Sequence, residues 1–151
     1  MSWIFRMVMP VDWREKVEPM WGVGVGVWAG DHELANNWFW SIPIGTAPRA
    51  FKFVRGVASK TGSDYESLSI QETELPDAWT RMEVVAVISR RERFGLIPGV
   101  TADVVVDGTR CLSIDLADDY EAEYGVCLAR IVRQGVHWEV NLDGTGFHLS
   151  S

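Results

Sequence analysis

The chain has 151 residues, of which 47% are hydrophobic and 23% charged, and its formal net charge is −7. This composition excludes a disordered chain, and the length predicts one domain spanning residues 1–151. The acidic balance argues against nucleic-acid binding, and the longest aliphatic run, Val84–Ile88, is far too short to span a bilayer.

The N-terminal segment and the cysteines predict a cytoplasmic protein. Arg6 interrupts the apolar N-terminal stretch and no basic leader precedes it, so a signal peptide is not expected. Cys111 and Cys127 have apolar neighbours and fit no CxxC motif. We therefore expect two reduced thiols in the core, with a disulfide as the alternative.

The N-terminal elements are predicted to be a strand and a short helix. The strand covers Trp3–Met9. Asp12 as N-cap and Glu15 three residues later form a capping box, and Pro19 ends the helix that they begin.

Residues 20–29 alternate with a period of two, which predicts a strand. Gly22, Gly24 and Gly26 leave one face of this strand without side chains, so an aromatic ring, another backbone or a ligand must lie against it. We favour a structural role for these glycines, with tryptophan rings as cover.

Two motif-like readings of this region fail. Residues 24–29 match GxGxxA, but the apolar alternation continues as a strand where a helix should begin, and no acid follows about 20 residues later. Residues 32–36 begin like HExxH but end in Asn36, so the second zinc-binding imidazole is missing. We instead expect a turn or single helical turn over residues 31–37 and then a strand, with Trp28, Trp38 and Trp40 near the connection.

The middle of the chain is predicted to contain a helix and two strands. Helical spacing of apolar residues predicts a helix over Thr46–Ser59, with a strand over residues 50–54 as the alternative. Residues 65–73 alternate and predict a strand. Arg81–Ser89 is β-branched and apolar on both faces, which favours a buried central strand over a helix.

The C-terminal third predicts hairpins. Asp107-Gly108 is a favoured type I′ turn within residues 102–114. Residues 127–150 predict a three-stranded meander with turns at Gln134-Gly135 and Asp143-Gly144. Its core face would carry Cys127, Ala129, Ile131, Trp138, Val140, Leu142, Phe147 and Leu149. The predicted fold class is therefore α+β: strand-rich, with a mainly antiparallel sheet and one to three short helices.

The opposite face of this meander is one candidate site. The predicted register places Arg130, Glu139 and His148 across from one another, with His137 beside them. Two histidines and a carboxylate could bind a metal or act as an acid–base pair. A solvated cross-strand ion pair explains the same residues more simply, and Arg130 disfavours a cation there, so we favour the ion pair.

The second candidate site is an acidic segment. It holds five carboxylates within nine residues: Asp115, Asp118, Asp119, Glu121 and Glu123. A calcium loop of the EF-hand type would need a central glycine that is missing, and glycoside hydrolysis would need a carboxylate separation that sequence does not give. We favour an exposed acidic turn, or a patch that binds a basic partner.

The leading functional hypothesis is a non-enzymatic binding protein of the immunity, antitoxin or phage-inhibitor type. It would mask a basic protein partner through the five carboxylates, with Trp38 and Trp40 as anchors, and would need no cofactor or metal. No nucleophile motif is present, so we do not favour an enzyme. One alternative is a small-molecule-binding protein or enzyme; another is a structural subunit of a phage or other assembly. The cleft of the former would be lined by Gly22, Gly24, Gly26, Trp28, His137, Glu139 and His148.

Overall fold

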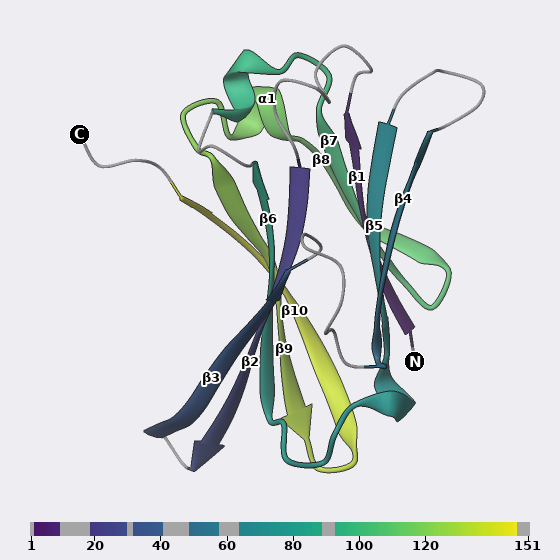
Figure 1. Ribbon diagram of the computed structural model, residues 1–151, viewed down its shortest axis with the longest axis vertical. Helices are drawn as coiled ribbons and strands as arrows, with labels where there is room; N and C mark the ends of the chain where they lie inside the picture. Colours follow the sequence, from purple (N-terminus) through teal and green to yellow (C-terminus); the bar gives the residue numbers. More distant parts are fainter. Residues whose placement is uncertain are drawn as a thin grey trace.

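The computed structural model describes residues 2–9, 19–29, 32–40, 49–57, 64–88 and 93–147. These residues form two five-stranded antiparallel sheets that face each other (Figure 1). The first sheet has the spatial order β4 (Phe51–Val57), β5 (Asp64–Gln71), β1 (Ser2–Met9), β7 (Thr101–Val106) and β8 (Thr109–Asp115). The second has the order β10 (His137–Phe147), β9 (Gly125–Gln134), β6 (Arg81–Ile88), β2 (Pro19–Ala29) and β3 (His32–Trp40).

Helical structure is sparse in the described part of the chain. It consists of two 3₁₀ turns, η2 (Glu72–Glu74) and η4 (Phe94–Leu96), and one four-residue helix, α1 (Leu116–Asp119). The predicted α+β class is therefore wrong, and the fold is a β-sandwich. No helix among the described residues is long and apolar enough to cross a membrane.

The largest error concerns Thr46–Ser59, whose described residues form a turn at 49–50 and then the strand β4. In β4 the side chain of Phe51 is buried and that of Lys52 exposed, which is the two-residue alternation of a strand. The short apolar run satisfied helical and strand spacing equally, and pairing with β5 decided between them. The helix predicted over residues 12–19 lies outside the described residues, apart from Pro19, which begins β2.

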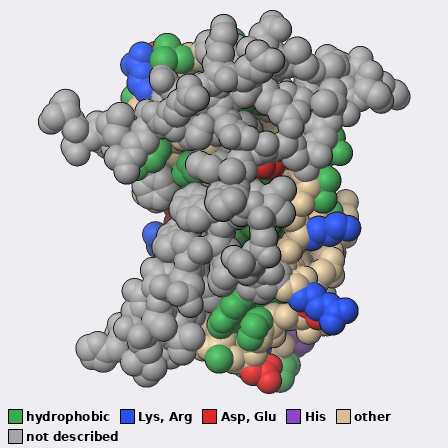
Figure 2. Space-filling view, in the orientation of Figure 1, with side chains coloured by type: hydrophobic (Ala, Val, Ile, Leu, Met, Phe, Trp, Pro, Cys, Tyr) green, Lys and Arg blue, Asp and Glu red, His purple; other side chains and the backbone are tan. Residues whose placement is uncertain are grey.

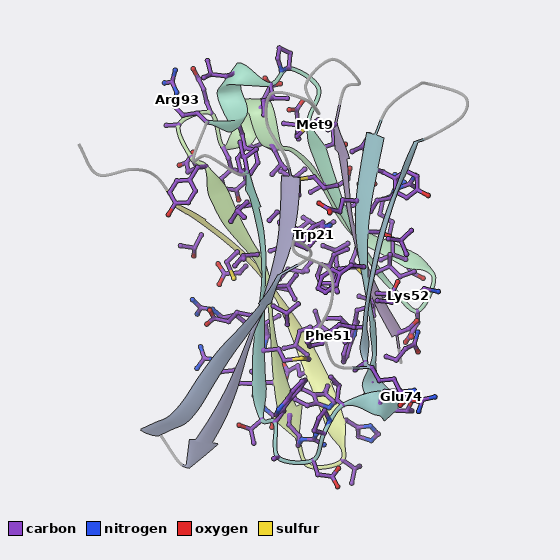
Figure 3. The ribbon with its side chains drawn as sticks, viewed as in Figure 1. Met9, Trp21, Phe51, Lys52, Glu74 and Arg93 are labelled. Carbon is purple, nitrogen blue, oxygen red and sulfur yellow. The ribbon has the colours of Figure 1, made fainter. Side chains whose placement is uncertain are left out.

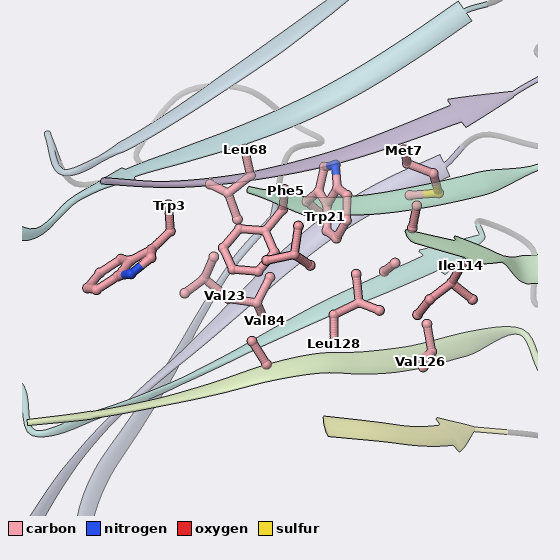
Figure 4. Packing of buried hydrophobic residues seen from close by; sticks show 14 of the residues in the cluster. Trp3, Phe5, Met7, Trp21, Val23, Leu68, Val84, Ile114, Val126 and Leu128 are labelled. Atoms are coloured by element: carbon pink, nitrogen blue, oxygen red, sulfur yellow. The ribbon is translucent and has the colours of Figure 1, made fainter. Parts of the chain in front are cut away.

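Apolar side chains from both sheets fill the space between them. Phe5 and Leu68 of the first sheet face Val84 and Leu128 of the second, and all four are fully buried (Figure 4). Trp21 of β2 extends across this core, and its indole Nε1–H donates a 2.8 Å hydrogen bond to the backbone carbonyl of Glu66 on β5 (Figure 3). This bond joins the two sheets, because β2 and β5 belong to different ones.

The strands predicted at Trp3–Met9, residues 20–29 and residues 65–73 are confirmed as β1, β2 and β5, although the last predicted strand gives way to η2 after Gln71. The strand predicted at Arg81–Ser89 is β6, the central strand of its sheet, and is buried on both faces over Val84–Ile88. The turn expected over residues 31–37 is wrong. β3 already begins at His32, because its backbone pairs with β2 from Ala29 onward.

The hairpin between β7 and β8 is confirmed. Asp107 and Gly108 both have positive φ, 48° and 83°, as a type I′ turn requires. Asp107 also accepts a hydrogen bond from the backbone N–H of Ser2 through its side chain, which ties the turn to the start of β1.

The predicted C-terminal meander is wrong in its second turn. β10 continues through Asp143-Gly144, which form a bulge in the strand opposite β9. The first turn consists of Gly135-Val136 instead of Gln134-Gly135, because Gln134 still pairs with His137.

Despite this change of register, part of the predicted core face is buried. Ala129, Ile131 and Trp138 are buried in the main core as expected, whereas Leu142 is 44% exposed. Cys127 is buried on the other face of the sheet, because the register with β6 and with β10 skips one residue of β9 between Cys127 and Ala129. Both cysteines are free thiols, but Cys111 is exposed, so the expectation of two core thiols is correct only for burial of Cys127.

Candidate functional site

The five predicted carboxylates gather at one end of the sandwich, around α1 (Figure 1). Leu116 and Ala117 anchor this helix in the core. The side chain of Asp115 caps it by accepting a 3.1 Å hydrogen bond from the backbone N–H of Asp118. Here we name the exposed carboxylates Asp115, Asp118, Asp119 and Glu121 the acidic end; Glu123 is half-buried beside them.

Two neighbouring segments hold the turn that follows α1. The backbone N–H of Gly95 in η4 donates to the carbonyl of Glu121 over 3.0 Å, and that of Phe94 donates to Glu123 over 2.9 Å. A Cβ at position 95 would lie 2.7 Å from the Glu121 carbonyl oxygen, which explains the glycine. Gly146 of β10 similarly leaves room for the side chain of Glu123.

Tyr120 links the acidic end to the bulge in β10. Its hydroxyl donates a 2.8 Å hydrogen bond to the backbone carbonyl of Gly144. Partial burial raises the pKa of this hydroxyl above its ordinary value, and the nearby carboxylates of Asp119, Glu123 and Asp143 raise it further. The neutral hydroxyl is thus the favoured form, and it keeps the proton that the bond requires.

Asp143 organises the bulge itself. Its carboxylate accepts hydrogen bonds from the backbone N–H groups of Gly144 (2.6 Å) and Thr145 (2.9 Å) and from the Thr145 hydroxyl (2.7 Å). The other carboxylate oxygen lies 3.0 Å from Nε of Arg130. The Thr145 hydroxyl bond is the main cause that lowers the pKa of Asp143; the backbone bonds and Arg130 act in the same direction.

Arg130 continues this network across the outer face of the second sheet. Its Nε also lies 3.7 Å from Glu83 of β6, which in turn is 3.5 Å from Arg81. Burial and the carboxylates of Asp143 and Glu83 raise the pKa of the Cys127 thiol to about 11. Cys127 is therefore a protonated structural thiol at neutral pH.

The predicted row of Arg130, Glu139 and His148 does not form in the structure. Arg130 pairs with Asn141 and Glu139 with Val132, because the turn lies one residue later than predicted. His137 and Glu139 are exposed at the opposite end of the hairpin from the acidic end, and His148 lies outside the described residues. In the described part of the chain, no group of three His, Cys, Asp or Glu side chains is placed to hold a metal ion.

The glycines and tryptophans of the alternative cleft lie on β2 and β3. Gly22 and Gly24 pair with Trp40 and Trp38 on one side and with Val85 and Glu83 of β6 on the other. Gly26 pairs with Asn36 and Arg81, and Trp28 pairs with Glu33. β6 and β9 separate these glycines from His137 and Glu139 on β10, so the strand order does not join the two groups into one cleft.

A groove of about 380 Å³ does lie near Glu139, at the edge of the sandwich. Its walls come from the β7–β8 hairpin and from β10. They consist of Val106, Cys111, Trp138, Glu139, Val140 and Leu142.

Sequence reasoning missed Tyr120, Arg130 and Asp143 as parts of the acidic end's support. The signal for Asp143 was the Asp-Gly-Thr triplet, since Asp followed by Gly and Thr commonly folds its side chain onto its own backbone. The same triplet also fits a hairpin turn, which is the structure that the sequence pattern predicts there. The link from Tyr120 to Gly144 spans 24 residues and has no local signature.

The structure is a β-sandwich with exposed carboxylates at one end. The other polar groups described around α1 cap that helix or join it to β10 through hydrogen bonds and an ion pair. Comparison with family models gives a match to the TerD domain over residues 54–150. The chain belongs to the TerD domain family. A search of curated proteins gives no match.

Two solved structures share the fold across nearly the whole chain. One is a homologue of telluride resistance protein (TerD) from Streptomyces coelicolor A3(2), with a TM-score of 0.73 and 15% identity, covering 98% of this chain and 90% of that one. The other is SAV2460, a protein of unknown function, with a TM-score of 0.73 and 14% identity, covering 100% and 92%. Family membership overturns the immunity, antitoxin or phage-inhibitor hypothesis.

Proposed function

We propose that this protein contributes to resistance against tellurium oxyanions, and that it does so by binding a protein partner through the acidic end. The family match over residues 54–150 carries the first part of the proposal. The likeness to a homologue of a telluride resistance protein supports the same role, because it extends the shared fold to the rest of the chain.

The construction of the acidic end supports the second part. Four carboxylates are exposed, while the turn beneath them is fixed by Asp115, by the Tyr120 hydroxyl and by backbone bonds to η4. A charged surface on a fixed backbone binds a cationic surface with less loss of conformational entropy than a mobile loop would. The expected partner is a protein with a basic surface, and the cytoplasm remains the expected compartment.

The resistance role is tested by growth on potassium tellurite. The gene would be deleted from its native host, and the deletion strain complemented with the wild-type gene or an empty vector. We expect the deletion to lower the tellurite concentration that stops growth and the wild-type gene to restore it. Equal tolerance in all strains, with the protein detected in the complemented strain, would overturn the proposal.

A further inference from the structure

Two neighbouring rows of side chains on the outer face of the first sheet are exposed and carry more basic than acidic groups. The alternation in β1 buries Phe5 and Met7 and turns Ile4 and Arg6 outward. The strand registers align two rows across all five strands of this sheet. The rows are Lys52–Ser69–Ile4–Val105–Arg110 and Val54–Ser67–Arg6–Asp103–Ser113.

We call these two rows the basic face. They contain three basic side chains, Arg6, Lys52 and Arg110, and one acid, Asp103, whose carboxylate lies 3.8 Å from the Arg110 guanidinium. Figure 2 shows Lys and Arg side chains on the right-hand flank of the molecule, where Figure 3 places Lys52. A net positive patch stands out on a chain whose net charge is −7.

Side chains of the basic face are accessible. Ile4 is 38% exposed and Val54 36% exposed, and the Arg110 side chain is 67% exposed. The outer side of the second sheet differs, because Val85, Val87 and Cys127 are buried there. The basic face therefore presents apolar and cationic side chains together, a combination found at protein–protein contacts.

We propose that the basic face binds the acidic end of a second copy of this chain. Arg6 and Lys52, with Arg110 beside Asp103, complement the four exposed carboxylates on the other surface. The β-branched side chains between these basic groups provide apolar contact. A polyanion such as nucleic acid or an anionic membrane fits less well, because the rest of the acidic surface would repel it.

The two surfaces are centred on different parts of the molecule, the acidic end on α1 at one end of the sandwich and the basic face on the strands of the first sheet (Figure 1). They adjoin at Asp115, which pairs with Thr101 in the row next to Asp103 and Ser113. The contact is therefore heterologous, head to tail, and leaves one unused surface on each terminal copy. Association of this kind builds rings or open chains instead of closed two-fold dimers. It is independent of the resistance role proposed above, although both use the acidic end.

Analytical ultracentrifugation of the full chain tests this contact. At low salt we expect the average mass to rise with concentration above the 17.0 kDa of the monomer and to return to it at high salt. Arg6→Gln/Lys52→Gln and Asp118→Asn/Asp119→Asn should each weaken self-association by about tenfold or more. The second variant lowers the net negative charge, so its loss of association cannot come from general repulsion.

Mixing the two variants gives the sharpest result. Each retains the surface that the other lacks, so an equimolar mixture should form a 1:1 complex that cannot grow further. Arg81→Gln/Arg93→Gln is the control, since it changes net charge as much as Arg6→Gln/Lys52→Gln while leaving the basic face intact. The control should associate.

Three outcomes would overturn the proposal: a wild-type protein that stays monomeric at every concentration and salt, variants that associate as the wild type does, or a mixture without a 1:1 complex. None of these would affect tellurite tolerance as measured by gene deletion, so the two proposals fail separately.

Discussion

Asp143 shows how one side chain shapes the region beside the acidic end. It holds the β10 bulge through three hydrogen bonds and an ion pair with Arg130. The bulge brings the Gly144 carbonyl within reach of Tyr120. The Asp143 carboxylate on β10 therefore helps to hold the turn that follows α1.

The charge of Asp143 should stabilise the fold in a pH-dependent way. The folded-state pKa lies below the ordinary value of 3.8, so the contribution is present above that value and disappears as the pH falls through the folded-state pKa. Asp143→Asn should lower the free energy of unfolding by about 1 kcal/mol at neutral pH. Urea unfolding should show the difference shrinking in acid, while the exposed Asp77→Asn should change little. A difference that does not vary with pH would contradict this role.

The two thiols should react at very different rates. Cys111 is exposed, whereas Cys127 is buried and its pKa is raised to about 11. Since the thiolate is the nucleophile, iodoacetamide near neutral pH should modify Cys111 in the folded protein and reach Cys127 only after unfolding. Mass spectrometry of peptides counts the labels, and rapid labelling of Cys127 in the native protein would disprove its burial.

Tyr120→Phe removes only the hydroxyl that joins the turn after α1 to β10. Loss of the 2.8 Å bond to Gly144 should cost about 0.5–1.5 kcal/mol of unfolding free energy. Tyr65→Phe is the control, because Tyr65 contacts Arg6 through its ring face, which the substitution retains. Equal stability of the Tyr120→Phe variant and the wild type in urea unfolding would show that this bond contributes nothing.

At the scale of elements, alternation was the reliable signal. β1, β2, β5 and β6 follow from period-two or continuously apolar patterns, and the β7–β8 hairpin from Asp107-Gly108. A short apolar run that fits both helical and strand spacing cannot be assigned from its own sequence. β4 is an example, because its pairing with β5 fixes it as a strand.

The register of the C-terminal hairpin shows the same limit. The predicted turn is one residue too early. As a result the strand partner of Glu139 is Val132 and not Arg130, and the candidate site built on the predicted pairing does not exist. The acidic segment needed no register, because its five carboxylates are neighbours in sequence. The hydrogen bonds that hold it come from η4 and β10, which are distant in sequence, so the acidic segment itself carries no signal for them.

The two glycines that face the acidic turn should differ in their tolerance of a methyl group. At Gly95 the new Cβ meets the backbone carbonyl of Glu121, whereas at Gly146 it meets the side chain of Glu123, which can rotate away. We expect Gly95→Ala to cost about 1–3 kcal/mol and Gly146→Ala clearly less. Chemical denaturation measures both, and the reverse order would contradict the packing described for η4.

At the scale of the whole molecule, charge is divided between two surfaces of the sandwich. The acidic end and the basic face are held apart by a core that joins both sheets, as at Trp21. The chain belongs to the TerD domain family, and the resistance role proposed for it rests on the acidic end. The central claim is that the acidic end is needed for that resistance.

The most direct measurement is the tellurite tolerance of the deletion strain carrying Asp118→Asn/Asp119→Asn. Both carboxylates are exposed and the Asp115 cap remains, so the fold should be intact. Glu74→Gln/Asp77→Asn is the matched control, because both side chains are exposed and Glu74 lies at the opposite end of the molecule from α1 (Figures 1 and 3). With equal protein levels, the account predicts that the control restores wild-type tolerance and the Asp118/Asp119 variant does not. Full restoration by both variants would contradict it.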